Sequence, residues 1–325
     1  MTLDDTYLDH LYQAISQAHH ALRPQVAVTP LAHSTWFSAD SGCEVYFKCE
    51  HLQHTGSFKF RGASNTLRLL DESARAHGVI TASSGNHGQG LALAGRLLGV
   101  PVTVYTTRQA SPVKLDAIRA LGAEVISLDT DPLSVELEAA RQARSQGKPF
   151  VSPYNDPQII AGQGTIGMEL AEQLPTLDAV FVAVGGGGMI SGIATALKHL
   201  RPGVQVIGCW PANAPTLQRS LEAGRIIEMD EQDTLSDGTA GGVEPDAITF
   251  PLCQRLLDRT VLVSEQAIAQ AMRDVAANER WIIEGAAGVA VAGLRELAHE
   301  YRGKRVAVVL CGRNILLEKF LRAVQ

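Results

Sequence analysis

Few cysteines occur in this sequence, and their spacing fits neither a disulfide framework nor a zinc site. There are five in 325 residues, and no two are spaced as C-x-x-C. Disulfide-rich secreted domains and structural zinc sites both depend on such paired spacing. We therefore expect small buried thiols in a reducing compartment, the cytoplasm. The five are Cys43, Cys49, Cys209, Cys253 and Cys311.

Clusters of basic residues, long apolar runs and metal-ligand motifs are also missing from the sequence. The net charge is −6 with a pI near 5.9, whereas nucleic-acid binding depends mainly on Lys and Arg that neutralise phosphates. No apolar run approaches the roughly 18 residues that cross a bilayer. The ten histidines never follow the H-E-x-x-H spacing of a zinc site. We expect no nucleic-acid partner, no membrane segment and no metal.

The sequence does contain a regular alternation of short apolar runs and helical patterns. Strands rich in Val and Ile that alternate with helices predict parallel sheets covered by helices on both faces. At 325 residues the chain is too long for one small core. We expect an α/β fold of two lobes, with a small domain of residues 54–152 inserted into a large domain of residues 1–53 and 153–325. In the small domain, strands are predicted at 77–83, 100–106, 123–128 and 148–153.

Four consecutive glycines follow a strand-like run in VFVAVGGGGMISG, residues 180–192. Glycine lets the backbone turn tightly and approach a ligand, and the N-terminus of the next helix favours an anion. A tight turn alone would need one or two glycines, so we interpret the loop as a phosphate site. A dinucleotide site is the weaker alternative, because it expects an acidic residue after the next strand, where Trp210 and Pro211 stand. The glycines are Gly185, Gly186, Gly187 and Gly188.

A second loop of this kind is TASSGNHGQG, residues 81–90, again between a strand and a helix. Its hydroxyls, its amide and its closely spaced N–H groups at one helix N-terminus suit a carboxylate. The alternative is that Ser84 or Asn86 simply caps the helix, which the sequence allows equally well. A third segment, VAVVLCGRN at 306–314, ends a strand at Cys311 and by itself predicts only a turn.

One lysine is flanked by two aromatic rings in SFKFRG, residues 57–62, although aromatic residues make up only 5% of the chain. Lysine stems often lie along apolar surfaces while the charge reaches water, so the hexapeptide alone fits an ordinary amphipathic helix start. Desolvation between Phe58 and Phe60 would instead lower the pKa of Lys59 and provide a free amine for nucleophilic chemistry.

Six motifs in a fixed order carry a resemblance to a known family. They are TGSFKFRGA, SSGNHGQG, AGQGTIGMEL, VGGGGMISG, EGAAGVAVA and VVLCGRN. Together they resemble the pyridoxal-phosphate (PLP) enzymes of the tryptophan-synthase-β fold type, and within it the threonine/serine dehydratase and serine racemase branch.

The resemblance implies a PLP site in the large domain. Lys59 would hold PLP as a Schiff base, with Phe58 beside it, and would move the α-proton of the substrate. Cys311 would face the pyridine nitrogen as a neutral partner, which favours β-elimination. Glu284 would lie near the ring, although a carboxylate placed at the N-terminus of its own helix for stability is an equal alternative. The phosphate would lie on Gly185, Gly186, Gly187, Gly188 and Met189.

The resemblance also assigns the substrate side of the site. Asn86 would bond the phenolic oxygen of PLP, and in racemase-like members the serine that matches Ser84 is an acid/base on the face opposite the lysine. The carboxylate of an amino-acid substrate would be held by Ser83, Ser84, Asn86 and His87.

The function implied is a lyase that converts a β-hydroxy amino acid, such as L-threonine or L-serine, into a 2-keto acid and ammonia. A racemase, or an enzyme with both activities, is the first alternative, and a non-catalytic amino-acid-binding relative is the second. Racemase-like relatives carry acidic metal ligands where this chain has Trp210 and Thr216, so we expect no metal there. The family also implies a homodimer.

Overall fold

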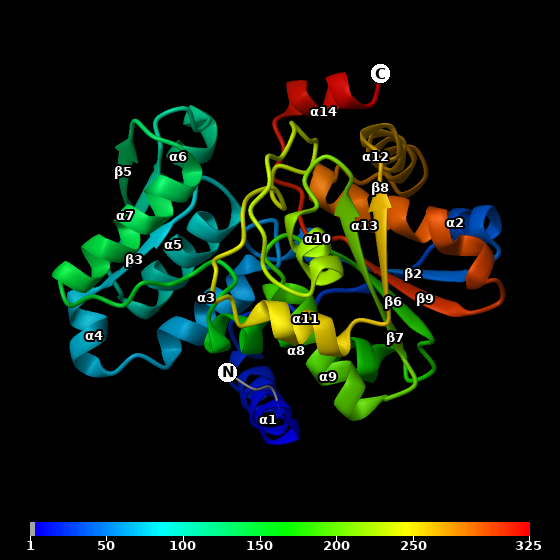
Figure 1. Cartoon of the computed structure of the whole chain (residues 1–325), viewed down its shortest axis with the longest axis horizontal. Helices are drawn as coiled ribbons and strands as arrows, with labels where there is room; N and C mark the ends of the chain where they lie inside the picture. Colours follow the sequence, from blue (N-terminus) through cyan, green and yellow to red (C-terminus); the bar gives the residue numbers. More distant parts are fainter. Residues whose placement is uncertain (1–3) are drawn as a thin grey trace.

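A six-stranded sheet forms the core of the larger lobe in the computed structural model (Figure 1). The structure describes residues 4–325, apart from the side chains of residues 132 and 133. In order across the sheet, its strands are β1 (Leu31–His33), β2 (Glu44–Lys48), β9 (Arg305–Val309), β6 (Ala179–Ala183), β7 (Gln205–Pro211) and β8 (Arg259–Val263). β1 pairs with β2 in the antiparallel direction. The other neighbouring pairs are parallel. The predicted parallel sheet is therefore confirmed, with one antiparallel strand at its edge.

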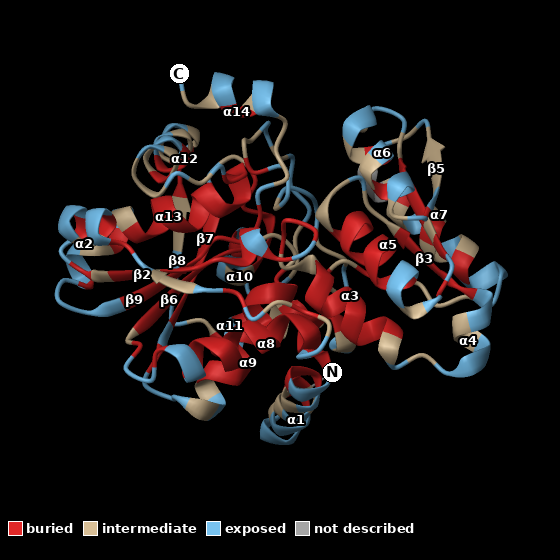
Figure 2. Ribbon diagram, turned by 180° about the vertical axis from the view of Figure 1, so that it is seen from behind, coloured by how far each residue is buried: buried red, intermediate tan, exposed pale blue. Residues whose placement is uncertain are grey.

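The central strands of this sheet are apolar because helices cover both of its faces. Every residue of β6 is buried. Helix α13 (Gly285–Leu297) packs across β6, β7, β8 and β9. Figure 1 places α13 and α12 (Glu265–Glu279) on one side of the sheet, with α8 (Pro157–Gln173) and α9 (Gly188–Leu200) on the other. Figure 2 shows the same strands buried between these helices.

The smaller lobe is built on a three-stranded parallel sheet in the order β3-β4-β5. Its helices pack against these strands, α7 on β3 and β4, α5 on β4 and α6 on β5. The elements are β3 (Val79–Ala82), α5 (Asn86–Leu98), β4 (Val102–Thr107), α6 (Pro112–Ala120), β5 (Glu124–Leu128) and α7 (Pro132–Ser145).

The strand predicted at 148–153 is wrong. Only one isolated parallel bridge forms there, between Phe150 and Ile80. Two backbone hydrogen bonds support it, from the Ile80 N–H to the Pro149 carbonyl and from the Val151 N–H to the Ile80 carbonyl. Pro149 and Pro153 lack an N–H group, so the ladder cannot extend through them.

Two helices cross closely where the lobes meet, α3 (Lys59–Arg68) and α8. A side-chain Cβ on Gly162 would lie 2.5 Å from the Cα of Gly62, and a Cβ on Gly62 would lie 2.9 Å from the Ile159 carbonyl oxygen. Only glycine fits at such a contact. The crossing fixes the first turn of α3, which carries Lys59. The exact domain boundaries, 54–152 for the small domain, stay a prediction.

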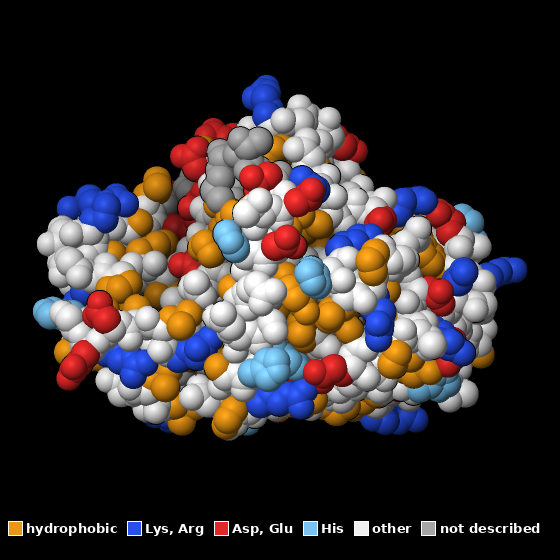
Figure 3. All heavy atoms as spheres, turned by 90° about the horizontal axis from the view of Figure 1, so that it is seen from below, with side chains coloured by type: hydrophobic (Ala, Val, Ile, Leu, Met, Phe, Trp, Pro, Cys, Tyr) orange, Lys and Arg blue, Asp and Glu red, His pale blue; other side chains and the backbone are white. Residues whose placement is uncertain are grey.

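The remaining helical elements complete the fold around the two sheets. No helix within residues 4–325 is long and apolar enough to cross a membrane. On the face drawn in Figure 3, basic and acidic side chains are interspersed. These elements are α1 (Asp5–Leu22), α2 (Thr35–Ser41), η1 (Glu50–Leu52), α4 (Glu72–His77), α10 (Thr216–Ala223), α11 (Thr249–Leu256), η2 (Ala298–Glu300) and α14 (Leu317–Ala323).

Candidate active site

A cavity of about 340 Å³ is lined by residues of both lobes. The loops that follow β3, β6 and β9 meet there with the N-terminus of α3. The carboxyl ends of parallel strands are the usual place for a ligand in α/β proteins. The structure brings all of the predicted site residues to this cavity: Phe58, Lys59, Ser83, Ser84, Asn86, His87, Gly185, Gly186, Gly187, Gly188, Met189, Glu284 and Cys311.

Lys59 is the first residue of α3, and its amine faces the cavity. The Nζ atom donates to the Pro153 carbonyl at 2.8 Å and lies 5.2 Å from the centre of the Phe58 ring. Burial of the amine lowers the pKa of Lys59 to about 8. The fraction of neutral, nucleophilic amine near neutral pH is therefore far larger than for an exposed lysine.

The expectation that both rings shield Lys59 is correct for Phe58 and wrong for Phe60. Phe60 is fully buried in the core of the smaller lobe, where its ring meets that of His54 at 5.4 Å. Successive residues of a helix point about 100° apart. Phe58 and Phe60 are two positions apart, so their rings point about 200° apart, to nearly opposite sides of the helix.

The glycine loop leaves no space for side chains. A Cβ on Gly186 would lie 2.4 Å from the ring of Tyr154, and Gly187 has a left-handed φ of 87°. A Cβ on Gly185 would lie 2.8 Å from the Thr239 carbonyl oxygen. Helix α9 begins at Gly188, and Gly187 supplies no side-chain cap. The first N–H groups of α9 are thus available to an anion in the cavity.

The loop after β3 does not serve as a helix cap. The N-cap of α5 is Gly85, which makes no side-chain hydrogen bond, so the alternative that Ser84 or Asn86 caps the helix is wrong. His87 is buried, and its Nε2 lies 3.2 Å from the Val151 carbonyl oxygen. Burial, then Lys59, lowers the pKa of His87 to about 3, so the ring is neutral. Its Nδ1 is buried with no partner in the described structure.

A hydrogen-bonded cluster joins three of these segments. The Asn86 side-chain amide donates to Glu284 at 2.7 Å, and the Asn314 side-chain amide donates to Asn86 Oδ1 at 2.7 Å. The Asn314 backbone N–H donates to the other Glu284 oxygen at 3.0 Å. Burial, then Asp237, raises the pKa of Glu284 to about 7. Glu284 therefore does more than stabilise its own helix: it links α13, α5 and the loop after β9.

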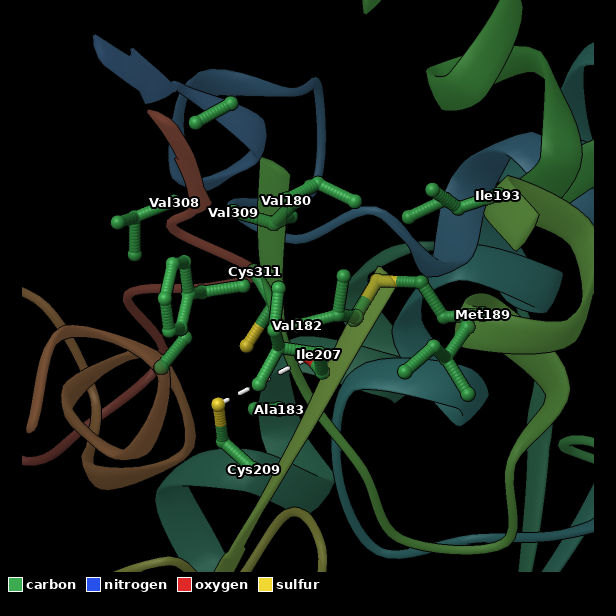
Figure 4. Close-up of a cluster of buried hydrophobic side chains, with 14 of the residues drawn as sticks. Val180, Val182, Ala183, Met189, Ile193, Ile207, Cys209, Val308, Val309 and Cys311 are labelled. Carbon is green, nitrogen blue, oxygen red and sulfur yellow. Dashed lines mark hydrogen bonds between the residues drawn. The ribbon is translucent and has the colours of Figure 1, made fainter. Parts of the chain in front are cut away.

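Cys311 lies where β9 ends, at the inner wall of the cavity. Figure 4 shows it among Val182 and Ala183 of β6 and Cys209 of β7. Its carbonyl accepts a hydrogen bond from the Phe58 N–H at 3.1 Å, which ties this wall to the turn before Lys59. Burial, then Glu284, raises the pKa of the Cys311 thiol, so the thiol is neutral.

The sequence did not single out several other residues of the cavity wall. Glu136 comes from α7 and Lys114 from α6, while Tyr154 follows the smaller lobe and supports the glycine loop. Asp237 pairs with Lys114 at 2.9 Å and with Lys319 at 3.4 Å. None of these residues lies in a motif. Only their contacts with residues far away in the chain identify them as part of the cavity wall, and the sequence does not show those contacts.

The end of β7 and the segment after it are held by protein contacts. Trp210 is buried in the core, and the Thr216 hydroxyl donates to Glu231. Glu231 also accepts a hydrogen bond from the Gly241 N–H at 2.7 Å. Among the described residues, no three His, Cys, Asp or Glu side chains form a group that could hold a metal ion.

A model of the pyridoxal-phosphate dependent enzymes matches residues 22–312. The chain belongs to this family. It is 42% identical to an L-threonine ammonia-lyase of Thermotoga maritima over 93% of this chain and 75% of that protein. It is 32% identical to a serine racemase of Schizosaccharomyces pombe over 98% of both. The processed form of threonine deaminase isoform 2 from Solanum lycopersicum has a TM-score of 0.94 at 33% identity, covering 99% of this chain and 89% of that structure.

The residues of the cavity fit the cofactor of this PLP-dependent family. The glycine loop forms a cradle that a Cβ would fill, beside the N-terminus of α9, and a phosphate group suits that place. Lys59 offers an amine with a lowered pKa for a bond to an aldehyde. The predicted fold class, family and cofactor are thereby confirmed.

Proposed function

We propose that this enzyme is an ammonia-lyase that converts a β-hydroxy amino acid, such as L-threonine or L-serine, into a 2-keto acid and ammonia. The observation that carries the proposal is that Lys59, the glycine loop and the loop after β3 face one cavity. An amine, a phosphate cradle and a carboxylate site are the three parts that such a reaction needs in one place. The similarity to an L-threonine ammonia-lyase over 93% of the chain supports the same activity.

In the proposed reaction, the residues that line the cavity have separate roles. Lys59 would hold the cofactor and take the proton from the α-carbon of the substrate. Asn86 would bond the phenolic oxygen of the cofactor, and Gly185–Gly188 with Met189 would bind its phosphate. PLP, when bound, supplies an electron sink for the α-carbon. The substrate carboxylate would lie on Ser83, Ser84, Asn86 and His87, at the N-terminus of α5.

Two buried groups, the Cys311 thiol and the Glu284 carboxyl group, would affect the cofactor and the residues that hold it. A neutral Cys311 thiol would face the pyridine nitrogen and leave it unprotonated, which favours prompt elimination over slower chemistry at the α-carbon. Glu284 would hold the Asn86 amide in place, since it accepts the hydrogen bond of that amide.

A panel of β-hydroxy amino acids tests this function. Purified protein loaded with PLP should release keto acid and ammonia from L-threonine or L-serine and should show Schiff-base absorbance. A Lys59→Ala variant should lose both the absorbance and the activity. A wild-type protein that shows the absorbance and releases no keto acid from any member of the panel would exclude the lyase function.

Racemisation is the second candidate, because Ser84 lies on the wall of the same cavity as Lys59. A hydroxyl on the face opposite the lysine could return the proton with inverted stereochemistry. Chiral analysis of recovered serine distinguishes the candidates: a Ser84→Ala variant should lose racemisation and keep most of the elimination.

We also propose that the enzyme is a cytoplasmic homodimer. All five cysteines are free and buried in the structure, which suits a reducing compartment. Light scattering on the purified protein and fractionation of the source cells test the two statements.

A further inference from the structure

Glu136 lines the same cavity as Lys59 and has no role in the function proposed so far. It lies in the first half of α7, in the smaller lobe, and its charge acts on Lys59. Its Oε1 atom is buried, and no hydrogen-bond donor of the described structure reaches it. An acceptor buried without a donor is costly, so this oxygen needs either a proton of its own or a ligand.

Glu244, from the loop before α11, faces Glu136 within hydrogen-bonding reach. Glu244 is well supplied with donors: the Asn155 side-chain amide at 2.7 Å and the Ser152 hydroxyl at 3.4 Å. Its backbone N–H donates to the Tyr154 hydroxyl at 2.8 Å. The Asn155 and Ser152 side chains both donate to the Glu244 carboxylate, and no donor of the described structure reaches Glu136 Oε1, so a proton between the two carboxyl groups belongs on Glu136.

The surroundings of Glu136 agree with this placement of the proton. Burial, then the charge of Glu244, raises the pKa of Glu136 to about 7, while Lys59 acts in the opposite direction. Tyr154 also interacts with Glu136, and burial raises the pKa of Tyr154. A carboxylic acid with a pKa close to the working pH is well suited to general acid catalysis.

The proposed elimination requires such an acid, because hydroxide leaves carbon readily only when it takes up a proton. Three other ionisable groups on the cavity wall are engaged elsewhere. His87 is neutral and directs Nε2 at the Val151 carbonyl. Both oxygens of Glu284 accept hydrogen bonds, and Lys114 is paired with Asp237.

We propose that Glu136 is the catalytic acid that protonates the departing β-hydroxyl group of the substrate. This inference rests on the proposed lyase function. The Lys59 amine takes the α-proton, the electron pair of that C–H bond forms the Cα–Cβ double bond, and the Cβ–O pair leaves on oxygen. The Glu136 proton joins that oxygen, so water departs. Lys59, now an ammonium, returns a proton to the Glu136 carboxylate, and no outside reactant is needed.

The experiment compares two substrates on the PLP-loaded enzyme, L-serine and β-chloro-L-alanine, since chloride leaves without a proton. Replacing Glu136 by Gln keeps the shape and removes the transferable proton. The kcat for L-serine should fall about 100-fold or more, the usual share of a general acid, and that for β-chloro-L-alanine should fall far less. Glu138→Gln is the matched control, because Glu138 is on the same helix and pairs with Arg141 at the surface. The Glu138→Gln variant should keep the wild-type kcat for both substrates.

The pH dependence gives a second readout. Both substrates need Lys59, so the ratio of their kcat/KM values cancels its titration. For the wild type, the ratio of L-serine to β-chloro-L-alanine should fall as the pH rises through about 7, the pKa of Glu136. For Glu136→Gln the ratio should be flat. The variant should keep the Schiff-base absorbance and melting temperature of the wild type, which shows that it is folded and loaded.

Three results would overturn the role of Glu136: equal losses with both substrates, full activity of the variant on L-serine, or a wild-type ratio that does not change with pH. A wild type that acts on β-chloro-L-alanine and on no β-hydroxy amino acid would instead refute the proposed function itself. The two failures are therefore distinguishable.

Discussion

The carboxylate of Glu284 accepts a hydrogen bond from the side-chain amide of Asn86 at 2.7 Å, although the two residues are 198 positions apart in the chain. The bond joins the N-terminus of α13 in the larger lobe to that of α5 in the smaller one. Asn314 closes the cluster, bonding Asn86 through its side chain and Glu284 through its backbone. The position of the loop that would meet the substrate carboxylate thus depends on the buried carboxyl group of Glu284.

Glu284 should make the stability of the cofactor-free protein depend on pH. Folding raises the pKa of Glu284 from its ordinary 4.5 to about 7, so the folded state binds this proton more tightly. The contribution of protonated Glu284 to the free energy of unfolding is complete below pH 4.5 and is lost as the pH rises to about 7. Over that window the free energy of unfolding should fall by up to about 3 kcal/mol more in the wild type than in Glu284→Gln. Urea unfolding at several pH values measures this, and parallel curves for the two proteins would contradict it.

Arg61 should be essential for the stability of the fold around Lys59. Its guanidinium is buried and donates to both oxygens of Glu50, each at 2.8 Å, and to Glu169 at 2.6 Å. Lys48 also donates to Glu169. Arg61→Ala would leave the buried carboxylate of Glu50 without its hydrogen-bonded cation, a loss of about 3–5 kcal/mol.

The matched control for this change is Arg141→Ala, because Arg141 forms an exposed pair with Glu138. That pair should contribute less than about 1 kcal/mol. Chemical unfolding compares the two variants. Similar losses in both would show that the buried network adds no stability of its own.

Gly186→Ala should weaken cofactor binding. The added Cβ would lie 2.4 Å from the Tyr154 ring, so either the ring or the loop must move, and with the loop would move the N–H groups proposed to bind the phosphate. We expect the dissociation constant for PLP to rise about tenfold or more, which corresponds to about 1.4 kcal/mol. Gly203→Ala is the control, because nothing lies within 4 Å of a Cβ there. Absorbance titration measures both, and equal affinity of the two variants would contradict the prediction.

The sequence predicted the architecture well because the signals for it are local. Val- and Ile-rich runs such as the one that forms β6 need buried neighbours wherever they lie, and the glycine loop has no use for four glycines outside a close contact. The strand expected at 148–153 failed for an equally local reason, since Pro149 and Pro153 cannot donate to a ladder.

The site was predictable only where a residue stands in a motif. Lys59 and Cys311 belong to such motifs. Glu136 does not, because what distinguishes it is the carboxyl group of Glu244, 108 positions further along the chain. The prediction that Phe60 shields Lys59 failed because the order of residues in the hexapeptide does not by itself show the direction in which each side chain of the helix points.

Cys311 should influence which reaction follows removal of the α-proton. The thiol is buried and neutral, since burial raises its pKa, and in the proposed site it faces the pyridine nitrogen. Cys311→Asp would place a carboxyl group there and would favour a protonated nitrogen, which stabilises charge at the α-carbon for longer. Racemisation should therefore increase relative to keto-acid release, whereas Cys311→Ser, which keeps a neutral partner, should leave the ratio near that of the wild type. Chiral chromatography of recovered L-serine, alongside a keto-acid assay, gives both rates. The same ratio in Cys311→Asp and Cys311→Ser, with PLP bound in both, would show that the partner of the nitrogen does not determine the outcome.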